Sequence, residues 1–257
     1  MKKGLIFIFF LLMLSSSSVL AAPLDDYSRA GNGNVSITIM NNDARNVEKT
    51  NRATSGISFG NKISFGTEVT IAVAPRWALS LDYSLFNSDR QRIRTVPGNY
   101  SWDEKYKLNS INFKVKYQAY KKGRFFVAPY IGVARNQAKL YGDFWNLGGI
   151  GNDFKYNYST KSRISVMGGV TLVYNLDRAG KLSTYFDGSL GYKMYSWNFG
   201  VTYKVAKNFS LDVGYKYYEA KLYYHVDEYR GAIHLKGQGD YHMKNKGIYL
   251  GLNYNFR

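Results

Sequence analysis

The sequence lacks cysteine altogether, has only four prolines, and contains no apolar stretch long enough for a transmembrane helix. Without cysteine, neither a disulfide framework nor the lipid anchor of a lipoprotein is available to the chain. A membrane-spanning helix needs about 20 consecutive apolar residues. The apolar run at residues 4–14 is too short for this purpose.

Glycine and tyrosine are abundant, with 25 and 24 residues, and aromatic residues make up 17% of the 257 residues. Aromatic side chains favour strands, whereas glycine allows sharp bends and close approaches between backbones. The length is that of one domain. The composition therefore predicts a single all-β domain.

The N-terminus has the three-part pattern of a secretory signal peptide. Lys2 and Lys3 supply the positive charge, residues 4–14 are apolar, and residues 15–18 are serines. We expect cleavage after Ala21, because a cut one residue later would place proline directly after the cut. Residues 1–21 are therefore predicted to be a signal peptide that is removed during export.

Apolar side chains alternate with polar or small ones over long stretches of the remaining chain. Ile248, Leu250 and Leu252 fall on one face of an extended segment, and Gly251 and Asn253 fall on the other. Each such segment has one apolar face, because side chains of a strand point alternately to opposite sides. Ten segments show the pattern: 34–44, 57–74, 77–90, 107–120, 125–142, 161–176, 182–193, 197–206, 209–223 and 244–256.

The connections between these segments alternate strictly between short and long. The short turns are 75–76, 121–124, 177–181 and 207–208, and the long polar segments are 91–106, 143–160 and 224–243. Outer-membrane barrels have short periplasmic turns and longer outer loops. A soluble β-sandwich has no reason to sort its connections in this way.

We therefore predict a transmembrane, antiparallel, up-and-down β-barrel of about ten strands that lies in the outer membrane. Residues 22–33 are expected to be a short periplasmic segment, and residues 34–257 the barrel. Eight strands are the alternative. A short outer turn is expected near Tyr195 and Ser196, between segments 182–193 and 197–206.

The last strand carries a family resemblance. Gly247 to Phe256 alternates apolar residues and ends on Tyr254 and Phe256, which resembles the C-terminal signal of outer-membrane barrels. The resemblance implies that the barrel-assembly machinery reads this signal during insertion, although Arg257 follows the final aromatic residue. From about residue 34 onward, the chain resembles the opacity-type small outer-membrane β-barrel family. That resemblance implies a fold and no catalytic motif.

Enzyme chemistry finds little support in the sequence. The omptin proteases are implied to need paired Asp residues on one outer loop and an Asp-His pair on another. Here the nearest acidic pair is Asp103-Glu104, and His225-x-Asp227 has the reversed order. The outer turn at 194–196 is too short to hold half of such a site. We therefore expect no catalytic residue, and we keep an omptin-like protease only as a remote alternative.

Neither a cofactor nor a metal is predicted. The three histidines, His225, His234 and His242, fall in the last outer loop with spacings that match no tight ligand motif. A solvated loop of mixed charge explains them better than a metal site.

Positive charge is the strongest compositional bias. The full chain carries +17, and removal of Lys2 and Lys3 leaves 33 basic residues against 18 acidic ones, a net charge of +15. A basic surface attracts polyanions. The expected partners are membrane lipid, with lipopolysaccharide as a candidate, and an unknown surface ligand. Nothing predicts specific nucleic-acid binding. The alternative is that these charges are simply solvated, with lipid headgroups as counterions.

Several residues of the outer loops are candidates for ligand contact. They combine a basic face at the root of one long loop with aromatic and imidazole side chains of the last one. The candidates are Arg90, Arg92, Arg94, Tyr223, Tyr224, Tyr229, His225 and His234.

The inward faces of the strands carry charges that we expect to pair. By alternation, Glu68, Asp82, Lys114 and Lys116 point into the lumen at similar heights, and Lys204 with Asp212 forms a second pair near a turn. A buried charge is tolerated only when it is paired and hydrogen-bonded. We therefore predict a lumen salt-bridge network.

Large inward side chains add to this filling of the lumen. Tyr185, Tyr218 and Tyr249 are predicted to point inward, and barrels of about eight strands are filled by side chains, whereas open channels need about 16. The favoured function is a non-catalytic surface protein that works through its outer loops. A narrow passive porin for small solutes is the alternative.

Overall fold

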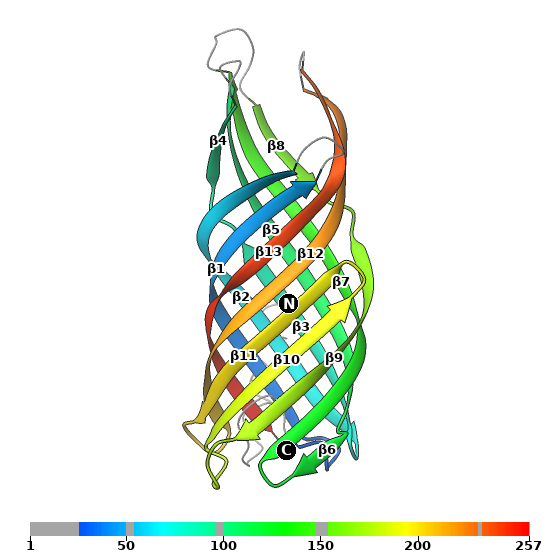
Figure 1. The fold of residues 1–257 in the computed structure, drawn as a ribbon, viewed down its shortest axis with the longest axis vertical. Coiled ribbons are helices and arrows are strands. Elements are labelled where there is room, and N and C mark those ends of the chain that lie inside the picture. The colour runs from blue at the N-terminus through cyan, green and yellow to red at the C-terminus, as the bar shows by residue number, and fades with distance from the viewer. Residues whose placement is uncertain (1–25, 50–53, 96–99, 147–153, 231–232, 257) are drawn as a thin grey trace, which may run out of the picture.

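A computed structural model of the chain describes residues 26–49, 54–95, 100–146, 154–230 and 233–256. Ten long strands among these residues form a closed antiparallel barrel (Figure 1). They are β1 (Gly33–Lys49), β2 (Thr54–Ala74), β3 (Trp77–Asn87), β5 (Tyr100–Tyr117), β7 (Phe125–Asn146), β9 (Arg163–Asn175), β10 (Leu182–Gly191), β11 (Met194–Lys204), β12 (Phe209–Arg230) and β13 (Ile233–Phe256).

Each long strand pairs with the long strands before and after it along the chain, and the first pairs with the last. The seam between β1 and β13 runs from Gly33 opposite Phe256 to Lys49 opposite Asp240. Three short strands, β4 (Gln91–Thr95), β6 (Tyr120–Lys122) and β8 (Phe154–Ser159), pair with β5 or β7 and extend the wall. The prediction of ten antiparallel strands in one ring is therefore confirmed.

The outer connections differ from the prediction. The segments 91–106, 143–160 and 224–243 were expected to be loops, but most of their described residues are strand hairpins. In the last of them, β12 and β13 stay paired as far as Arg230 opposite Ile233. Beyond the membrane a hairpin can be polar on both faces, so the alternation that reveals a strand disappears while the pairing continues.

One outer turn lies elsewhere than predicted. The turn between β10 and β11 consists of Tyr192 and Lys193 rather than residues near Tyr195. Lys193 has a positive φ of 56°, a conformation that is uncommon outside glycine and that occurs here in the tight connection between the strands. This hairpin ends well below the outer ends of β12 and β13 (Figure 1).

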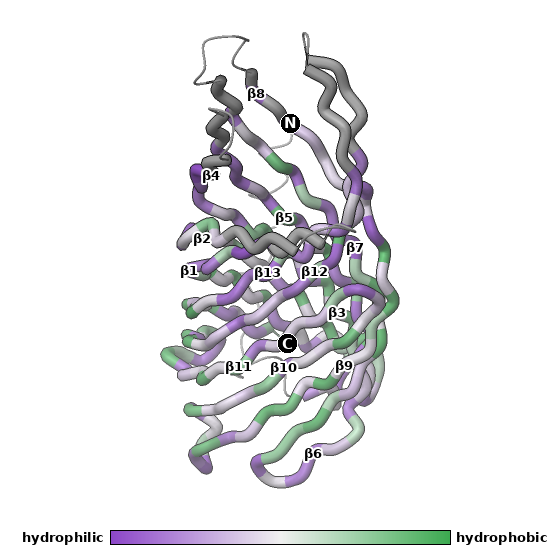
Figure 2. The backbone as a smooth tube through the Cα atoms, turned by 45° about the horizontal axis from the view of Figure 1, so that its top comes forward, coloured by the Kyte–Doolittle hydropathy of each residue, from purple (hydrophilic) through white to green (hydrophobic). Residues whose placement is uncertain are grey.

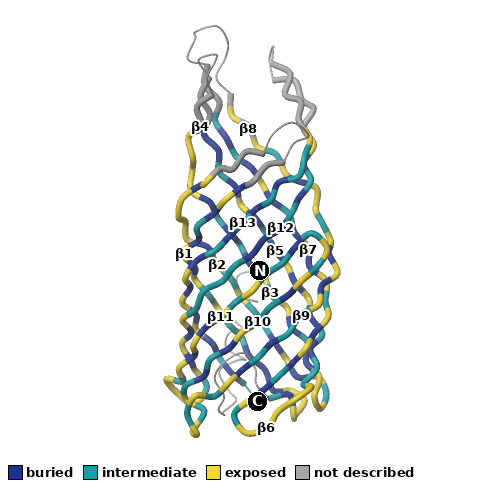
Figure 3. Tube along the Cα trace, viewed as in Figure 1, coloured by how far each residue is buried: buried dark blue, intermediate teal, exposed yellow. Residues whose placement is uncertain are grey.

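Side-chain exposure alternates along the membrane-spanning strands (Figure 3). On β13, Leu250 is 63% exposed while Tyr249 is 3% exposed, which confirms the predicted lipid and lumen faces. Hydrophobic positions concentrate in the lower part of the barrel, and hydrophilic ones dominate towards the outer end (Figure 2). The lower part is therefore the membrane-spanning belt. The described residues contain no helix that is long and apolar enough to cross a membrane.

Aromatic rings gather at the periplasmic edge of this belt. Trp77 packs on Tyr117 with ring centroids 4.8 Å apart, and Phe209 packs on Tyr254 at 5.0 Å. Phe256 covers Gly33 so closely that a Cβ on this glycine would lie 2.2 Å from the ring. Amphipathic rings suit the level of the lipid headgroups, and here they also close the seam between the first and last strands.

The lipid face can be tested by an arginine scan. Leu250→Arg should reduce the free energy of unfolding in lipid vesicles by about 2–4 kcal/mol, because the charge lies near the midplane of the bilayer. The matched change Val205→Arg, at an exposed position of the periplasmic turn, should cost about 0–1 kcal/mol. Urea titrations of the refolded protein measure both, and equal losses at the two positions would contradict the assigned membrane boundary.

Candidate functional site

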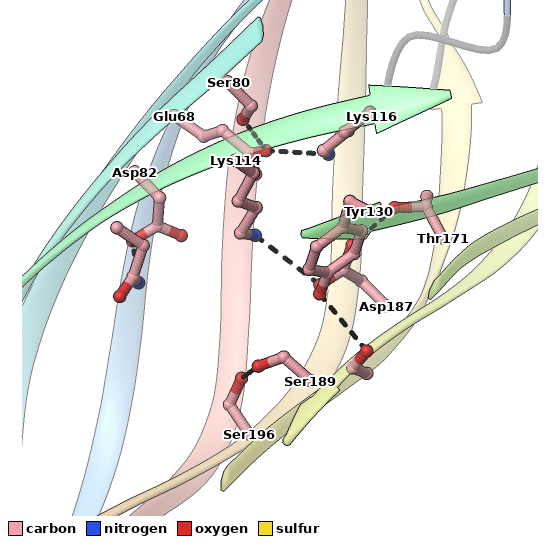
Figure 4. Close-up of polar contacts among 12 residues, drawn as sticks. Glu68, Ser80, Asp82, Lys114, Lys116, Tyr130, Thr171, Asp187, Ser189 and Ser196 are labelled. Atoms are coloured by element: carbon pink, nitrogen blue, oxygen red, sulfur yellow. Dashed lines mark hydrogen bonds and ion pairs between the residues drawn. The ribbon is translucent and has the colours of Figure 1, made fainter. Parts of the chain in front are cut away.

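The lower lumen contains a group of charged side chains contributed by strands from opposite parts of the wall (Figure 4). Glu68 on β2 and Lys116 on β5 form an ion pair, with Nζ 3.1 Å from Oε1. Ser80 donates a hydrogen bond of 2.6 Å to the same carboxylate oxygen. The Lys116 side chain is only 2% exposed, so the ion pair with this carboxylate offsets the cost of burying the ammonium group.

A second ion pair spans the lumen. Lys114 on β5 lies 3.6 Å from Asp187 on β10, although β7 and β9 separate these strands in the wall. Tyr130 and Thr171 donate hydrogen bonds of 2.9 and 2.6 Å to the two oxygens of Asp187. The Tyr130 ring also lies near both lysines, with Lys114 Nζ 5.1 Å from its centroid. Asp187 was absent from the predicted set, although its alternation with Tyr185 marks it as inward.

The other predicted lumen residues have different partners. Asp82 accepts hydrogen bonds of 3.2 Å from both Asn112 and Ser84, and Lys216 donates to Ser84 over 3.0 Å. Asp212 accepts hydrogen bonds from Thr202 and Asn253. Lys204 stands opposite Ser210, two pairs nearer to the periplasmic turn than the pair of Thr202 and Asp212.

These side chains surround a small cavity with a volume of about 90 Å³. Its lining includes Glu68, Asp82, Lys114, Asp187 and Lys216. Such a volume holds a few water molecules beside the charges. It is far smaller than the lumen of an open porin.

Tyrosine rings fill much of the lumen because glycines of the wall leave room for them. A Cβ on Gly169 would lie 2.4 Å from the Tyr130 ring, and one on Gly214 would lie 2.5 Å from the Tyr249 hydroxyl. Tyr185 and Tyr249 are hydrogen-bonded to each other across the barrel. The predicted inward orientation of Tyr185, Tyr218 and Tyr249 is confirmed by their burial.

An apolar and aromatic layer lies above the polar chamber. Phe59 meets Tyr106 edge to face with centroids 5.1 Å apart, and Phe86 stacks on Tyr218 at 5.0 Å. The layer also contains residues that are at most 1% exposed: Leu108, Leu140, Leu222 and Met243. Higher still, Tyr224 and Tyr241 stack with centroids 4.2 Å apart. The outer half of the lumen is therefore packed like the core of a soluble protein.

A segment before β1 closes the periplasmic end. Tyr27 is 1% exposed and packs edge to face on Phe126, with centroids 5.3 Å apart. Its backbone N–H donates to the Gln118 side chain over 3.0 Å, and its carbonyl accepts from the Arg76 backbone over 2.8 Å. Asp26 lies 3.3 Å from Lys121. Residues 26–32 form this periplasmic plug, whereas the sequence predicted only that residues 22–33 are a short periplasmic segment.

The Asp26 carboxyl is charged at neutral pH. Burial opposes its ionisation, but hydrogen bonds from Ser28 and the positive charge of Lys121 outweigh that effect and lower its pKa. The plug is therefore held by a charged group, hydrogen bonds and a buried ring together.

The candidate ligand residues of the outer hairpins separate into two groups. Arg90 and Arg92 point outward: Arg90 pairs with Asp143 and Asp103, and Arg92 lies 3.3 Å from Asp103. The hydrogen bond from Arg90 to Asp143 and the nearby carboxylate charges raise the pKa of this guanidinium. The Arg92 side chain is 63% exposed.

Tyr224, by contrast, points inward and stacks on Tyr241, so its predicted contact with a surface ligand is corrected. It belongs to β12, whose inward positions continue above the membrane. Tyr223 and His225 lie on the outward face of the same strand, where Tyr223 bonds Gln238 over 3.2 Å. The side chains of Arg94, Tyr229 and His234 lie outside the described residues.

The described residues contain no group of three or more His, Asp or Glu side chains arranged to hold a metal ion. Asp103 and Asp143 stand opposite each other but are engaged by arginines. The turn of Tyr192 and Lys193 carries neither histidine nor carboxylate.

The closed ring, the lipid-facing belt and the packed lumen define a transmembrane β-barrel of the outer membrane. The chain belongs to the outer membrane protein beta-barrel domain family, which matches residues 7–256. The resemblance to small outer-membrane barrels and the outer-membrane location are both confirmed. Among curated proteins, none matches this chain in sequence.

Several solved structures are similar in fold. The outer membrane protease OmpT from Escherichia coli is 11% identical, with a TM-score of 0.49, over 94% of this chain and 100% of its own. Neisserial surface protein A is 16% identical, with a TM-score of 0.35, over 87% of this chain and 97% of its own.

The attachment invasion locus protein Ail of Yersinia pestis, in complex with the heparin analogue sucrose octasulfate, is 14% identical with a TM-score of 0.36. That similarity covers 87% of this chain and 99% of Ail. These identities are too low to relate the activities of those proteins to this chain.

The ion pair across the lumen predicts an asymmetric response to removal of single carboxylates. Asp187→Asn should reduce the free energy of unfolding by about 3–5 kcal/mol, because it leaves the buried Lys114 charge without its partner. Asp82→Asn should cost only about 1 kcal/mol, because it changes hydrogen bonds rather than an ion pair. Urea titrations in lipid vesicles measure the free energy of unfolding of both variants. Adding Lys114→Met to Asp187→Asn should recover part of the loss; no recovery would contradict the pairing.

Proposed function

We propose that this protein is a non-catalytic surface protein whose outer hairpins bind ligands, and whose lumen is closed by packed side chains and a salt-bridge network. The single observation that carries the proposal is the presence of apolar closures on both sides of the polar chamber. Tyr27 and Phe126 lie at its periplasmic end, and Phe59 and Tyr106 lie towards its outer end. A solute would have to displace buried rings at two levels to cross.

The charges of the chamber fit a structural role better than a conducting one. Glu68 with Lys116 and Lys114 with Asp187 are paired across strands, and each carboxylate accepts further hydrogen bonds. Fully satisfied buried polar groups fix one arrangement of the elements that they join. In this proposal the ion pairs hold β2, β5 and β10 in one relative position.

Ligand contact is assigned to the hairpins beyond the membrane. Their strands extend well above the belt, and the exposed guanidinium of Arg92 points away from the lumen. The positive net charge of the chain favours an anionic ligand such as a sulfated or phosphorylated polysaccharide. No catalytic step is assigned to these residues, because the nearby carboxylates are engaged by arginines.

A narrow passive channel is the second candidate. The cavity of about 90 Å³ with a charged lining in the lower lumen is the observation that favours it. Such a channel would need the periplasmic plug and the outer aromatic layer to move together.

Conductance separates these two functions. Purified protein in planar bilayers should give no stable channel, because both closures are intact. The double variant Tyr27→Ala/Tyr106→Ala removes one ring from each closure and should raise the frequency of conducting events. Large, steady channels from the wild-type protein, unaffected by Asp82→Ala, would refute the closed lumen.

Binding at the outer hairpins is tested separately with heparin as an anionic polysaccharide. Arg92→Gln/Arg94→Gln should weaken binding of the refolded protein to immobilised heparin, and added salt should weaken the wild-type interaction. Arg178→Gln/Lys181→Gln removes the same charge at a periplasmic turn and serves as the matched control. Equal loss in the two variants would show that only net charge matters, against a site on the hairpins.

A further inference from the structure

The outward face of β5 and β7 carries positive charges that face each other. Lys107 on β5 stands directly opposite Lys139 on β7, and both side chains are exposed. Directly opposed side chains of an antiparallel pair lie about 4.5–5.5 Å apart at Cβ, so like charges there are destabilising. Lys105 and Arg135 lie on the same outward face of these strands.

Nearby acids do not neutralise this group. Asp103 and Asp143, the outward carboxylates further up the two strands, are paired with Arg90 and Arg92. No ion pair within the described residues includes Lys105, Lys107, Lys139 or Arg135. Arg135 instead donates a hydrogen bond of 2.8 Å to Ser162, and Lys105 lies 5.7 Å from the centre of the Tyr141 ring.

Around β13, at a comparable level of the wall, the outward basic side chains form ion pairs with acidic ones. Glu219 lies within 3.8 Å of Lys244 and 3.7 Å of His242, and Asp43 lies 3.5 Å from Lys246. There, bases and acids alternate across neighbouring strands. The face formed by β5 and β7 therefore differs from the wall around β13 in its excess of positive charge.

The position of these basic side chains on the barrel wall indicates which kind of anion binds them. Immediately below it, Ile111, Phe113 and Val133 are exposed to the hydrocarbon. Asn109 stands opposite Gln137 between the apolar belt and the pair of lysines. Along the wall, an upright ligand would thus meet apolar side chains, then Arg135 together with the two amides, and then the two lysines. That order is the order of acyl chains, sugar hydroxyls and phosphate in a phosphorylated glycolipid.

We propose that the outward face of β5 and β7 binds a phosphorylated glycolipid of the outer leaflet, with a phosphate between Lys107 and Lys139. Arg135 and the amides of Asn109 and Gln137 contact the saccharide portion nearer the acyl chains. The bound phosphate relieves the repulsion between the two lysines. This inference concerns the barrel wall, and it goes beyond the proposed role of the outer hairpins because it holds whether or not these bind a ligand.

A glycolipid fits this face better than the other anions available there. A soluble anion would make no contact with the exposed apolar side chains below the cations. A phospholipid carries its phosphate close to the acyl chains, whereas Lys107 lies four residues above Ile111, about 13 Å along the strand. A saccharide between acyl chains and phosphate spans that interval.

The experiment measures binding of diphosphorylated lipid A to the full mature chain refolded in a zwitterionic detergent. The heat-modifiable gel shift first confirms that each variant is folded. Lys107→Gln/Lys139→Gln should weaken binding by about tenfold or more, because the charge-assisted contacts of both lysines with the phosphate are lost. Lys107→Arg/Lys139→Arg should keep it. Lys122→Gln/Lys207→Gln, the matched change at the periplasmic end, should also leave it within about twofold.

Three comparisons complete the test. Dephosphorylated lipid A should bind much more weakly than the phosphorylated form, and phosphatidylglycerol should compete poorly. Without lipid, Lys107→Gln/Lys139→Gln should be as stable as the wild type or more stable, since it removes a repulsion. Equal binding of lipid A by this variant and the wild type would overturn the site. Equal binding of phosphatidylglycerol would overturn the assignment to a glycolipid.

Discussion

The structure depends on one constraint: inside the hydrocarbon, every backbone N–H and C=O must find a partner within the protein. An open sheet would leave two unpaired edges, so the first strand must meet the last. The long seam between β1 and β13, which begins at Gly33 opposite Phe256, satisfies this requirement. Closure then gives the sheet one lipid-facing and one lumen-facing side, and successive side chains of a strand point alternately to the two.

Closure also turns the lumen into a protein interior. Side chains that point inward cannot reach the bulk solvent easily, so charges there must find partners across the barrel. Lys114 and Asp187 do so over a lumen that is narrow enough for a 3.6 Å contact. Small wall residues such as Gly169 and Gly214 make room for the rings of Tyr130 and Tyr249. Ion pairing and ring packing both follow from the confinement of these side chains within the lumen.

Above the membrane, water can hydrogen-bond to the backbone and solvate charges, so the outward face of the wall can carry charged side chains. Around β13 the outward charges are matched within the protein, as with Glu219 and Lys244. On β5 and β7, Lys107 faces Lys139, and neither lysine has an ion-pair partner among the described residues. A barrel with a packed lumen has only this outer surface with which to act on its environment, which is why the proposed activities lie there.

Sequence alone determined the fold class, the ten strands, the periplasmic turns and the faces of residues such as Leu250 and Tyr249. These properties are local, since they follow from a period of two along one strand. Only the tertiary structure decided that Lys114 pairs with Asp187, that Tyr27 enters the periplasmic mouth and that β12 and β13 remain paired to Arg230. Such relations join strands that are not neighbours or lie beyond the membrane. They depend on the stagger and curvature of the closed ring, which no single strand encodes.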